Sequence, residues 1–172
     1  MIKAKDVKKV LRENNIDTKN ISVRSKIVGY DSSINVTLKD LSLPKHRIQK
    51  ILDKEFSSIS YDERCGEILG GGNTFVFVDY DYNLLENAIE EKIPLATEFV
   101  EELNSKDDYW GYRLAQNNNL TLFASKEIES LYVINEDNKR LAQWLFPNDK
   151  NSLSGNIYSV ARALVILENG NY

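Results

Sequence analysis

The residues best spaced for metal chemistry are two aspartates at the end of an apolar stretch. Asp79 and Asp81 follow the run Thr74–Val78 and stand two positions apart. Side chains two apart on a strand point to the same face, and paired carboxylates suit Mg²⁺. A metal-dependent nuclease using Asp79 and Asp81 is therefore one hypothesis. The alternative is that these carboxylates only end and solubilise a strand.

A second element of such nucleases would be an acid-x-lysine motif beside the first aspartate. Glu90-Glu91-Lys92 has this composition, but it falls in a helical pattern, whereas the nuclease motif lies on a strand. This placement favours the alternative, and we expect no metal and no cofactor.

The other chemistry-bearing residues do not assemble a catalytic site. His46 and Cys65 are the only histidine and the only cysteine, so a zinc site cannot be built from them. Nothing near His46 supplies the partners of a catalytic triad. The glycines at 70–72 lead into a strand and lack a following Gly-Lys-Ser/Thr, so we interpret them as a flexible hairpin connection and not as a phosphate loop. We therefore expect a protein that is not an enzyme.

The charge is distributed unevenly along the chain. The net charge of −4 combines residues 1–60, with 13 Lys/Arg against 7 Asp/Glu, and residues 61–172, with 9 against 19. Such asymmetry predicts two surfaces that attract different partners. The acidic candidates for partner binding are Asp79, Asp81, Glu90, Glu91, Glu98, Glu101 and Glu102. The basic candidates for nucleic-acid binding are Arg24, Lys26, Arg47, Lys50 and Lys54.

The first half of the chain has clear periodic patterns. A short helix is predicted around Val7–Leu11, followed by two alternating strands at 21–27 and 34–38 that form an antiparallel hairpin. The alternation places Arg24 and Lys26 on the solvent side. Pro44 opens a second helix, and 74–78 is apolar on both faces, which is typical of an interior strand.

The second half is predicted to be mainly helical. Helices are expected at 84–91, from Pro94 onward, at 139–146 and around 157–165, with strands at 120–123 and 131–134. The predicted class is α+β: an antiparallel sheet in an α-β-β-α-β unit, residues 1–83, with helices on one face. Residues 84–172 form an acidic extension that packs on this unit.

Composition restricts the cellular setting. A chain of 172 residues with 42% hydrophobic residues can bury a real core. It contains no apolar run near the ~20 residues that span a bilayer, and Met1–Asp6 lacks the apolar core of a signal peptide. With a single cysteine, we expect a cytoplasmic protein that does not associate with membranes.

Four short motifs stand out between residues 4 and 82, in the order helix, strand, strand, helix, strand. They are Ile21-Ser22-Val23-Arg24-Ser25, Ser32-Ser33-Ile34-Asn35-Val36, Ser60-Tyr61-Asp62 and Phe75-Val76-Phe77. With these motifs, the stretch resembles a large polyvalent protein-associated domain. The tryptophan and Thr-Asp-Gly-Pro that usually follow the second strand are replaced by Leu38-Lys39-Asp40, and the glycine pair before Ser-Ser is absent. The resemblance implies a protein of a plasmid, phage or conjugative element in a bacterial host.

The sequence is compatible with three functions. The first is a non-enzymatic inhibitor of a host defence nuclease, of the anti-CRISPR or antirestriction type, whose acidic residues occupy a nucleic-acid groove. The second is a nucleic-acid-binding accessory protein of a plasmid or conjugative element. The third is the metal nuclease that uses Asp79 and Asp81.

Overall fold

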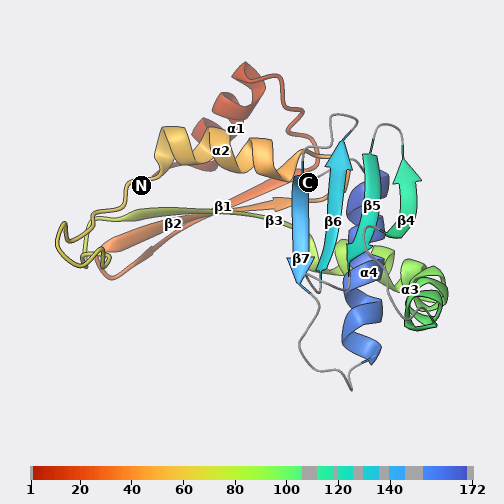
Figure 1. Ribbon diagram of the computed structural model, residues 1–172. Helices are drawn as coiled ribbons and strands as arrows, with labels where there is room; N and C mark the ends of the chain where they lie inside the picture. The colour runs from red at the N-terminus through yellow and green to blue at the C-terminus, as the bar shows by residue number, and fades with distance from the viewer. Residues whose placement is uncertain are drawn as a thin grey trace. The chain divides into compact units, whose positions relative to one another are not determined.

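The computed structural model describes residues 2–105, 112–117, 120–125, 130–135, 140–145 and 153–169. The chain divides into two compact units, Met1–Leu84 and Leu85–Tyr172, and each contains its own sheet (Figure 1). The elements are α1 (Ala4–Glu13), β1 (Ile21–Val28), β2 (Asp31–Leu38), α2 (Lys45–Phe56), β3 (Thr74–Tyr80), α3 (Tyr82–Asn104), β4 (Tyr112–Asn117), β5 (Leu120–Ser125), β6 (Ser130–Asn135), β7 (Arg140–Leu145) and α4 (Leu153–Asn169). The α+β class and the N-terminal α-β-β-α-β order are as predicted.

The first unit has a mixed sheet in the order β1-β2-β3. β1 and β2 form the expected antiparallel hairpin, but β3 runs parallel to β2. The prediction of a purely antiparallel sheet is therefore wrong. Its physical reason is the connection between β2 and β3: α2 crosses from one end of the sheet back to the other, so β3 starts where β2 starts. β3 is also an edge strand of this sheet, not the interior strand that its apolar residues suggested.

Both helices of the first unit lie on the same face of this sheet (Figure 1). Val7 and Leu11 of α1 and Ile48 and Leu52 of α2 are fully buried, as the helical periodicity predicts. They pack on alternate residues of the strands, since successive strand side chains point to opposite faces. The strand residues buried in this core are Ile21, Ile34, Val36, Leu38, Val76 and Val78.

The hairpin turn and the loop before β3 meet at one end of the sheet. Gly29 has a φ of 63°, as the first central residue of a two-residue type II′ turn requires. Gly71 and Gly72 also have positive φ, and the N–H of Gly72 donates to the Tyr30 carbonyl at 2.9 Å. The glycines at 70–72 thus let the loop fold back on the hairpin turn. Within the loop, Tyr61 pairs with Ile68 in an isolated bridge.

A single helix, α3, replaces the two helices predicted on either side of Pro94. Proline removes one intrahelical hydrogen bond and usually ends or kinks a helix. Here the buried stripe continues through it, with Ile89 before the proline and Ala96, Val100 and Leu103 after it. Burial on both sides offsets the missing bond, so the helix continues.

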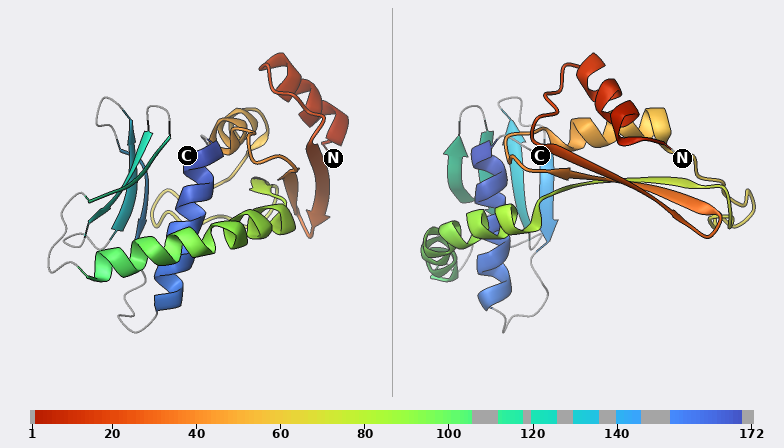
Figure 2. Two further views of the ribbon diagram at one scale, coloured as in Figure 1. Left: turned by 90° about the vertical axis from the view of Figure 1, so that its right-hand side faces the viewer. Right: turned by 180° about the vertical axis from the view of Figure 1, so that it is seen from behind.

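The second unit contains an antiparallel sheet in the order β4-β5-β6-β7. α4 packs against β4, β5 and β6 on one face of this sheet, and α3 crosses α4 (Figure 2). The strands predicted at 120–123 and 131–134 and the final helix are confirmed. The prediction of a mainly helical half lacked β4 and β7, which complete the four-stranded sheet. The predicted helix at 139–146 is wrong, because Arg140–Leu145 pairs with β6. No helix of the described residues is long and apolar enough to cross a membrane.

Candidate nucleic-acid interface

The sheet of the first unit has one face that its own helices leave uncovered. Strand register places residues side by side on this face in rows across β1, β2 and β3. One row is Arg24, Asn35 and Phe77, and the next is Lys26, Ser33 and Phe75. A third row is Ser22, Thr37 and Asp79. We call the surface formed by these nine residues the open sheet face.

Two phenylalanines on β3 form the apolar part of the open sheet face. Phe77 is 49% exposed, and Phe75 is partly buried. Their rings are stacked, with centroids 6.3 Å apart and planes 16° from parallel. The two valines between and after them, Val76 and Val78, point into the core instead. The apolar residues on both faces of β3 therefore serve two different surfaces.

Arg24 and Lys26 provide the positive charge of the open sheet face. Both side chains are exposed. Neither makes an ion pair or a side-chain hydrogen bond within the described residues. As the alternation predicts, they share this face with Asn35 and Thr37. Two cations that have no partner in the described part of the chain attract anions, and the phosphates of nucleic acids are anions that arginine and lysine bind.

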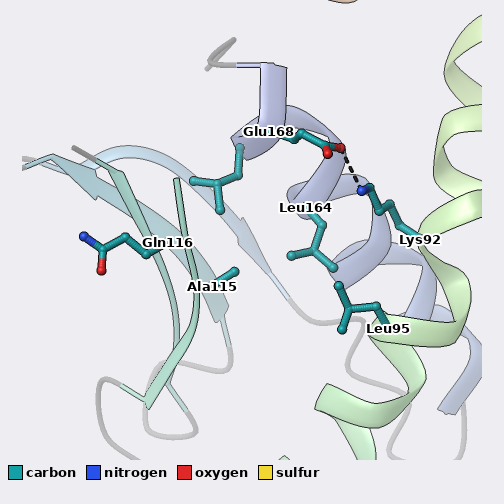
Figure 3. A pocket seen from close by; sticks show the side chains of 7 residues that line it. Lys92, Leu95, Ala115, Gln116, Leu164 and Glu168 are labelled. Atoms are coloured by element: carbon teal, nitrogen blue, oxygen red, sulfur yellow. Dashed lines mark ion pairs between the residues drawn. The ribbon is translucent and has the colours of Figure 1, made fainter. Parts of the chain in front are cut away.

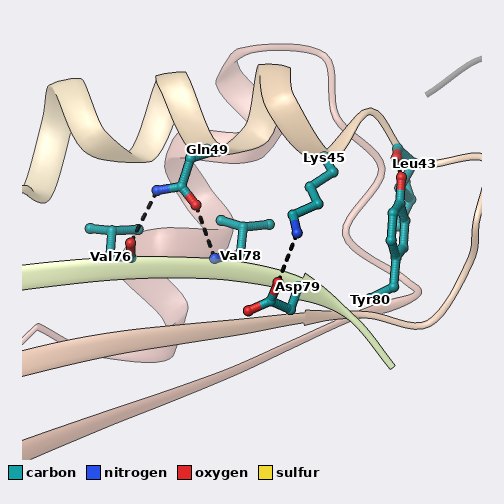
Figure 4. Close-up of polar contacts among 7 residues, drawn as sticks. All are labelled: Leu43, Lys45, Gln49, Val76, Val78, Asp79 and Tyr80. Atoms are coloured by element: carbon teal, nitrogen blue, oxygen red, sulfur yellow. Dashed lines mark hydrogen bonds and ion pairs between the residues drawn. The ribbon is translucent and has the colours of Figure 1, made fainter. Parts of the chain in front are cut away.

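The one carboxylate in the rows of the open sheet face is already neutralised. Lys45, at the start of α2, places its Nζ 2.7 Å from Asp79 Oδ1 over the edge of β3 (Figure 4). The Asp79 side chain is 73% exposed, so this pair contributes little stability. Its consequence is electrostatic: the carboxylate subtracts little from the positive field of Arg24 and Lys26.

The remaining basic candidates lie on another side of the first unit. Arg47, Lys50 and Lys54 are exposed on α2, which covers the opposite face of the sheet. The Arg47 guanidinium also donates to the Asn14 carbonyl at 3.0 Å. Because α2 separates them from the open sheet face, the five basic candidates do not form one surface.

The seven acidic candidates also separate into two groups. Asp79 pairs with Lys45, and Asp81 Oδ1 accepts a bond from the Leu84 N–H at 3.3 Å, which caps the start of α3. The others are exposed on α3. At 3.6 residues per turn they fall on one stripe, opposite the buried stripe that contains Ile89 and Val100. This acidic stripe consists of Glu90, Glu91, Glu98, Glu101 and Glu102.

The proposed metal pair therefore has other structural roles in this unit. Asp79 is bonded to a lysine and Asp81 to a helix N-terminus. Lys92, the lysine of the acid-x-lysine element, pairs with Glu168 at 2.8 Å. Among the residues that the structure describes, no three His, Cys, Asp or Glu side chains converge as a metal site would require. His46 and Cys65 are both exposed and lie on different elements.

A cavity of about 290 Å³ lies between α3, α4 and β4 in the second unit (Figure 3). Leu95 and Leu164 point into it, and the Lys92–Glu168 ion pair spans its rim. The charged groups of the lining are thus engaged with each other. This composition is that of a gap between packed helices, and it supplies no reactive group.

No family model, no curated protein and no solved structure matches this chain.

The phenylalanine pair is the part of this surface that the sequence analysis missed. The alternation of Phe75 and Phe77 with Val76 and Val78 already indicates that the two rings share one face of a strand. What the alternation does not show is which pair faces the helices. It also does not show that β3 aligns with β2 so that the rings join the rows of Arg24 and Lys26.

Proposed function

We propose that this protein is a non-enzymatic, nucleic-acid-binding accessory protein, and that its open sheet face contacts the phosphates. The observation that supports this most directly is the placement of Arg24 and Lys26. Both are exposed on the same face, two residues apart on β1, and neither has an anionic partner among the described residues. The nearby Asp79 is paired with Lys45. The face is therefore positive although the whole chain has a net charge of −4.

The setting of this function is a bacterial mobile element. The resemblance of residues 4–82 to large polyvalent protein-associated domains supports it, since such domains occur in plasmid, phage and conjugative-element proteins. Arg24 itself belongs to the Ser22-Val23-Arg24-Ser25 segment that carries the resemblance. The accessory protein acts in the cytoplasm of the host, where it meets incoming nucleic acid.

A gel-shift series at increasing salt tests the proposed function. Affinity for labelled DNA or RNA should fall as salt rises, because binding releases condensed counterions. Arg24→Ala/Lys26→Ala should weaken binding and flatten the salt dependence. Lys50→Ala/Lys54→Ala removes the same charge from α2 and is the matched control, with affinity close to wild type. Absence of retardation with every nucleic acid at low salt would eliminate this function.

The acidic stripe of α3 favours a second function, inhibition of a host defence nuclease of the anti-CRISPR or antirestriction type. Glu98 and Glu101 are exposed on the same side of one helix as the other glutamates of the stripe. A regular row of carboxylates imitates the spaced negative charge of a phosphate backbone, and it would compete for a basic groove on the nuclease.

Charge reversal separates this second function from the first. Glu98→Lys/Glu101→Lys should abolish inhibition of DNA cleavage by the target nuclease, whereas Arg24→Ala/Lys26→Ala should retain it. Lack of inhibition of any host nuclease by the wild-type protein at about tenfold molar excess would count decisively against an inhibitor.

A further inference from the structure

The rings of Phe75 and Phe77 lie outside the hydrophobic core of the first unit. Phe77 is 49% exposed, and the core on the other face is completed without either ring. The two rings are stacked, so they form one aromatic cluster and not two scattered apolar residues. Adjacent aromatic side chains outside the core, one of them half exposed, indicate a surface that binds a flat or apolar partner.

Each ring has a cation in the same row of the sheet. Phe77 aligns with Arg24 and Phe75 with Lys26, with one β2 residue between them in each row. Since neighbouring strands are about 4.8 Å apart, ring and cation are separated by about 10 Å at the backbone. The side chains of arginine and lysine are long enough to span much of this distance. A nucleotide has the matching pair of groups: a flat base and, on the other side of the sugar, a phosphate.

The residues between cation and ring are small and polar. Ser33 and Asn35 occupy these central positions, and the Asn35 amide donates to Ser33 Oγ at 3.1 Å. Thr37 continues the same line along β2. Small side chains leave a shallow surface on which a strand can lie. Their oxygens and amide groups can hydrogen-bond to sugars or base edges.

We infer that the open sheet face binds single-stranded nucleic acid, with bases stacked on Phe75 and Phe77 and phosphates held by Arg24 and Lys26. The inference rests on the proposed nucleic-acid-binding function and names its ligand class. A duplex hides the flat faces of its bases inside the stack, whereas a single strand offers them to aromatic side chains. Stacking tolerates any base, so recognition by this face depends little on sequence.

Fluorescence anisotropy with labelled homopolymers tests the inference. The probes are oligothymidylate and oligouridylate of about 12 nucleotides, a length typical of single-strand sites, and a DNA duplex of the same length. We expect the wild-type protein to bind the single strands at least about tenfold more tightly than the duplex. A stronger response to one homopolymer separates DNA from RNA as the source of the strand.

Two substitutions of the more exposed ring distinguish base stacking from apolar contact. Phe77→Leu keeps an apolar side chain but removes the ring, and it should reduce single-strand affinity about tenfold or more. Phe77→Tyr keeps the ring, so its affinity should stay within about threefold of the wild-type affinity. This change is smaller than the loss of affinity expected for Phe77→Leu. Thermal unfolding of both variants checks that the fold is retained. Equal affinity of Phe77→Leu and wild type would overturn the inference and would indicate an apolar protein partner for the rings.

The salt dependence of binding tests the role of Arg24 and Lys26. Arg24→Ala/Lys26→Ala should reduce the slope of log affinity against log salt by about 1.4, since each single-strand phosphate contact contributes about 0.7. Lys50→Ala/Lys54→Ala should leave the slope unchanged. If the wild-type protein binds duplex and single strand equally and Arg24→Ala/Lys26→Ala still weakens binding, the proposed function stands and the stacking inference fails. If no probe binds, both fail.

A measurement on the wild-type protein avoids any loss of folding in the variants. Ultraviolet cross-linking to an oligonucleotide that contains bromodeoxyuridine, followed by mass spectrometry, locates the residue next to the base. Cross-links at Phe75 or Phe77 support the inference. Cross-links confined to peptides of α1 or α2, on the opposite face of the sheet, would overturn it.

Discussion

The Gln49 side chain of α2 accepts a hydrogen bond from the backbone N–H of Val78 at 3.0 Å. Its amide also donates to the Val76 carbonyl at 3.1 Å (Figure 4). The same amide donates to Asp53 Oδ1 at 2.8 Å. These β3 groups face away from β2, at the edge of the sheet. Next to them, Ser58 and Thr74 exchange two backbone hydrogen bonds, of 3.1 and 2.7 Å. The edge of β3 is thus closed by a side chain and a loop, which prevents pairing with another chain.

The first prediction concerns Gln49. Gln49→Ala removes both bonds to β3 and leaves two backbone groups under a helix without partners. We expect the free energy of unfolding to fall by about 2 kcal/mol, since each unsatisfied buried group costs about 1–3 kcal/mol and water recovers part of it at an edge. Denaturant unfolding measures this, and light scattering tests for association through the exposed edge. Lys50→Ala, one residue away and exposed, is the control. An unchanged free energy of unfolding in Gln49→Ala would show that the edge bonds are not stabilising.

Side-chain periodicity predicts some elements of this fold correctly and others incorrectly, because it shows which side of an element is buried but not how elements are connected. Alternation in β1 and β2 correctly indicates the hairpin and the outward side of Arg24 and Lys26. It contains no information about strand direction, so the parallel pairing of β3 depends on the path of α2 across the sheet. Pro94 is a strong local signal for a helix end, yet burial on both sides of it keeps α3 continuous.

The short strands of the second unit are difficult to predict for another reason, which is their length. In Arg140–Leu145 the apolar residues suit a helical period as well as a strand, because six residues are too few to separate the two patterns. Pairing with β6 decides the outcome, and the apolar pattern of these six residues alone does not reveal that pairing. The candidate interface is likewise assembled by register: Arg24 and Phe77 are 53 positions apart in the chain but share one row.

The second prediction concerns Asn73, which holds the loop before β3 to the hairpin. Its side chain is 2% exposed, and its amide donates to Asp31 Oδ1 at 3.1 Å and to the Leu69 carbonyl at 2.7 Å. Its Oδ1 accepts from the Ser60 N–H at 2.8 Å. Asn73→Ala leaves these groups without partners, and we expect a loss of about 2–3 kcal/mol in denaturant unfolding.

Two further substitutions make this prediction specific. Asn73→Asp keeps the shape but removes the donors and places a second carboxylate beside Asp31, so it should be at least as destabilising as Asn73→Ala. Ser60→Ala retains the backbone N–H that bonds to Asn73 and should remain within about 0.5 kcal/mol of wild type. A stable Asn73→Asp variant would show that the amide donors do not hold the loop.

The third prediction concerns the alkaline limit of stability. Burial raises the pKa of Tyr80 to about 12, and its hydroxyl donates to the Leu43 carbonyl at 2.9 Å. Because this pKa is higher in the folded chain than in the unfolded chain, where it is about 10, the neutral phenol stabilises the fold. This contribution is complete below pH 10 and is lost as pH rises through about 12.

Ultraviolet titration of the phenols checks this expectation. Tyr80 should ionise about two pH units later than an ordinary phenol, and Tyr80→Phe should remove that late step. Persistence of the late step in Tyr80→Phe would contradict the prediction.

The fourth prediction concerns Asp40, in the connection between β2 and α2. The Ser42 hydroxyl, at 2.6 Å, and the Ser42 N–H, at 2.9 Å, both donate to Asp40 Oδ1 and lower the pKa of this carboxyl. The Asn20 amide adds a weaker contribution at 3.3 Å. A lowered pKa means that the ionised form stabilises the fold. Its contribution is present above pH about 4 and is lost as pH falls through the lower folded value.

Substitution of Ser42 separates the two donors of Asp40. Ser42→Ala should raise the pKa of Asp40 toward its ordinary value but not to it, because the backbone N–H of residue 42 still donates. Ser42→Thr keeps a hydroxyl and should retain the lowered pKa, and Asn20→Ala should raise it less than Ser42→Ala. Carboxyl-carbon chemical shifts followed by NMR through acid titration measure each value. If Asn20→Ala raised the pKa more than Ser42→Ala, the Ser42 hydroxyl would not be the main cause of the shift.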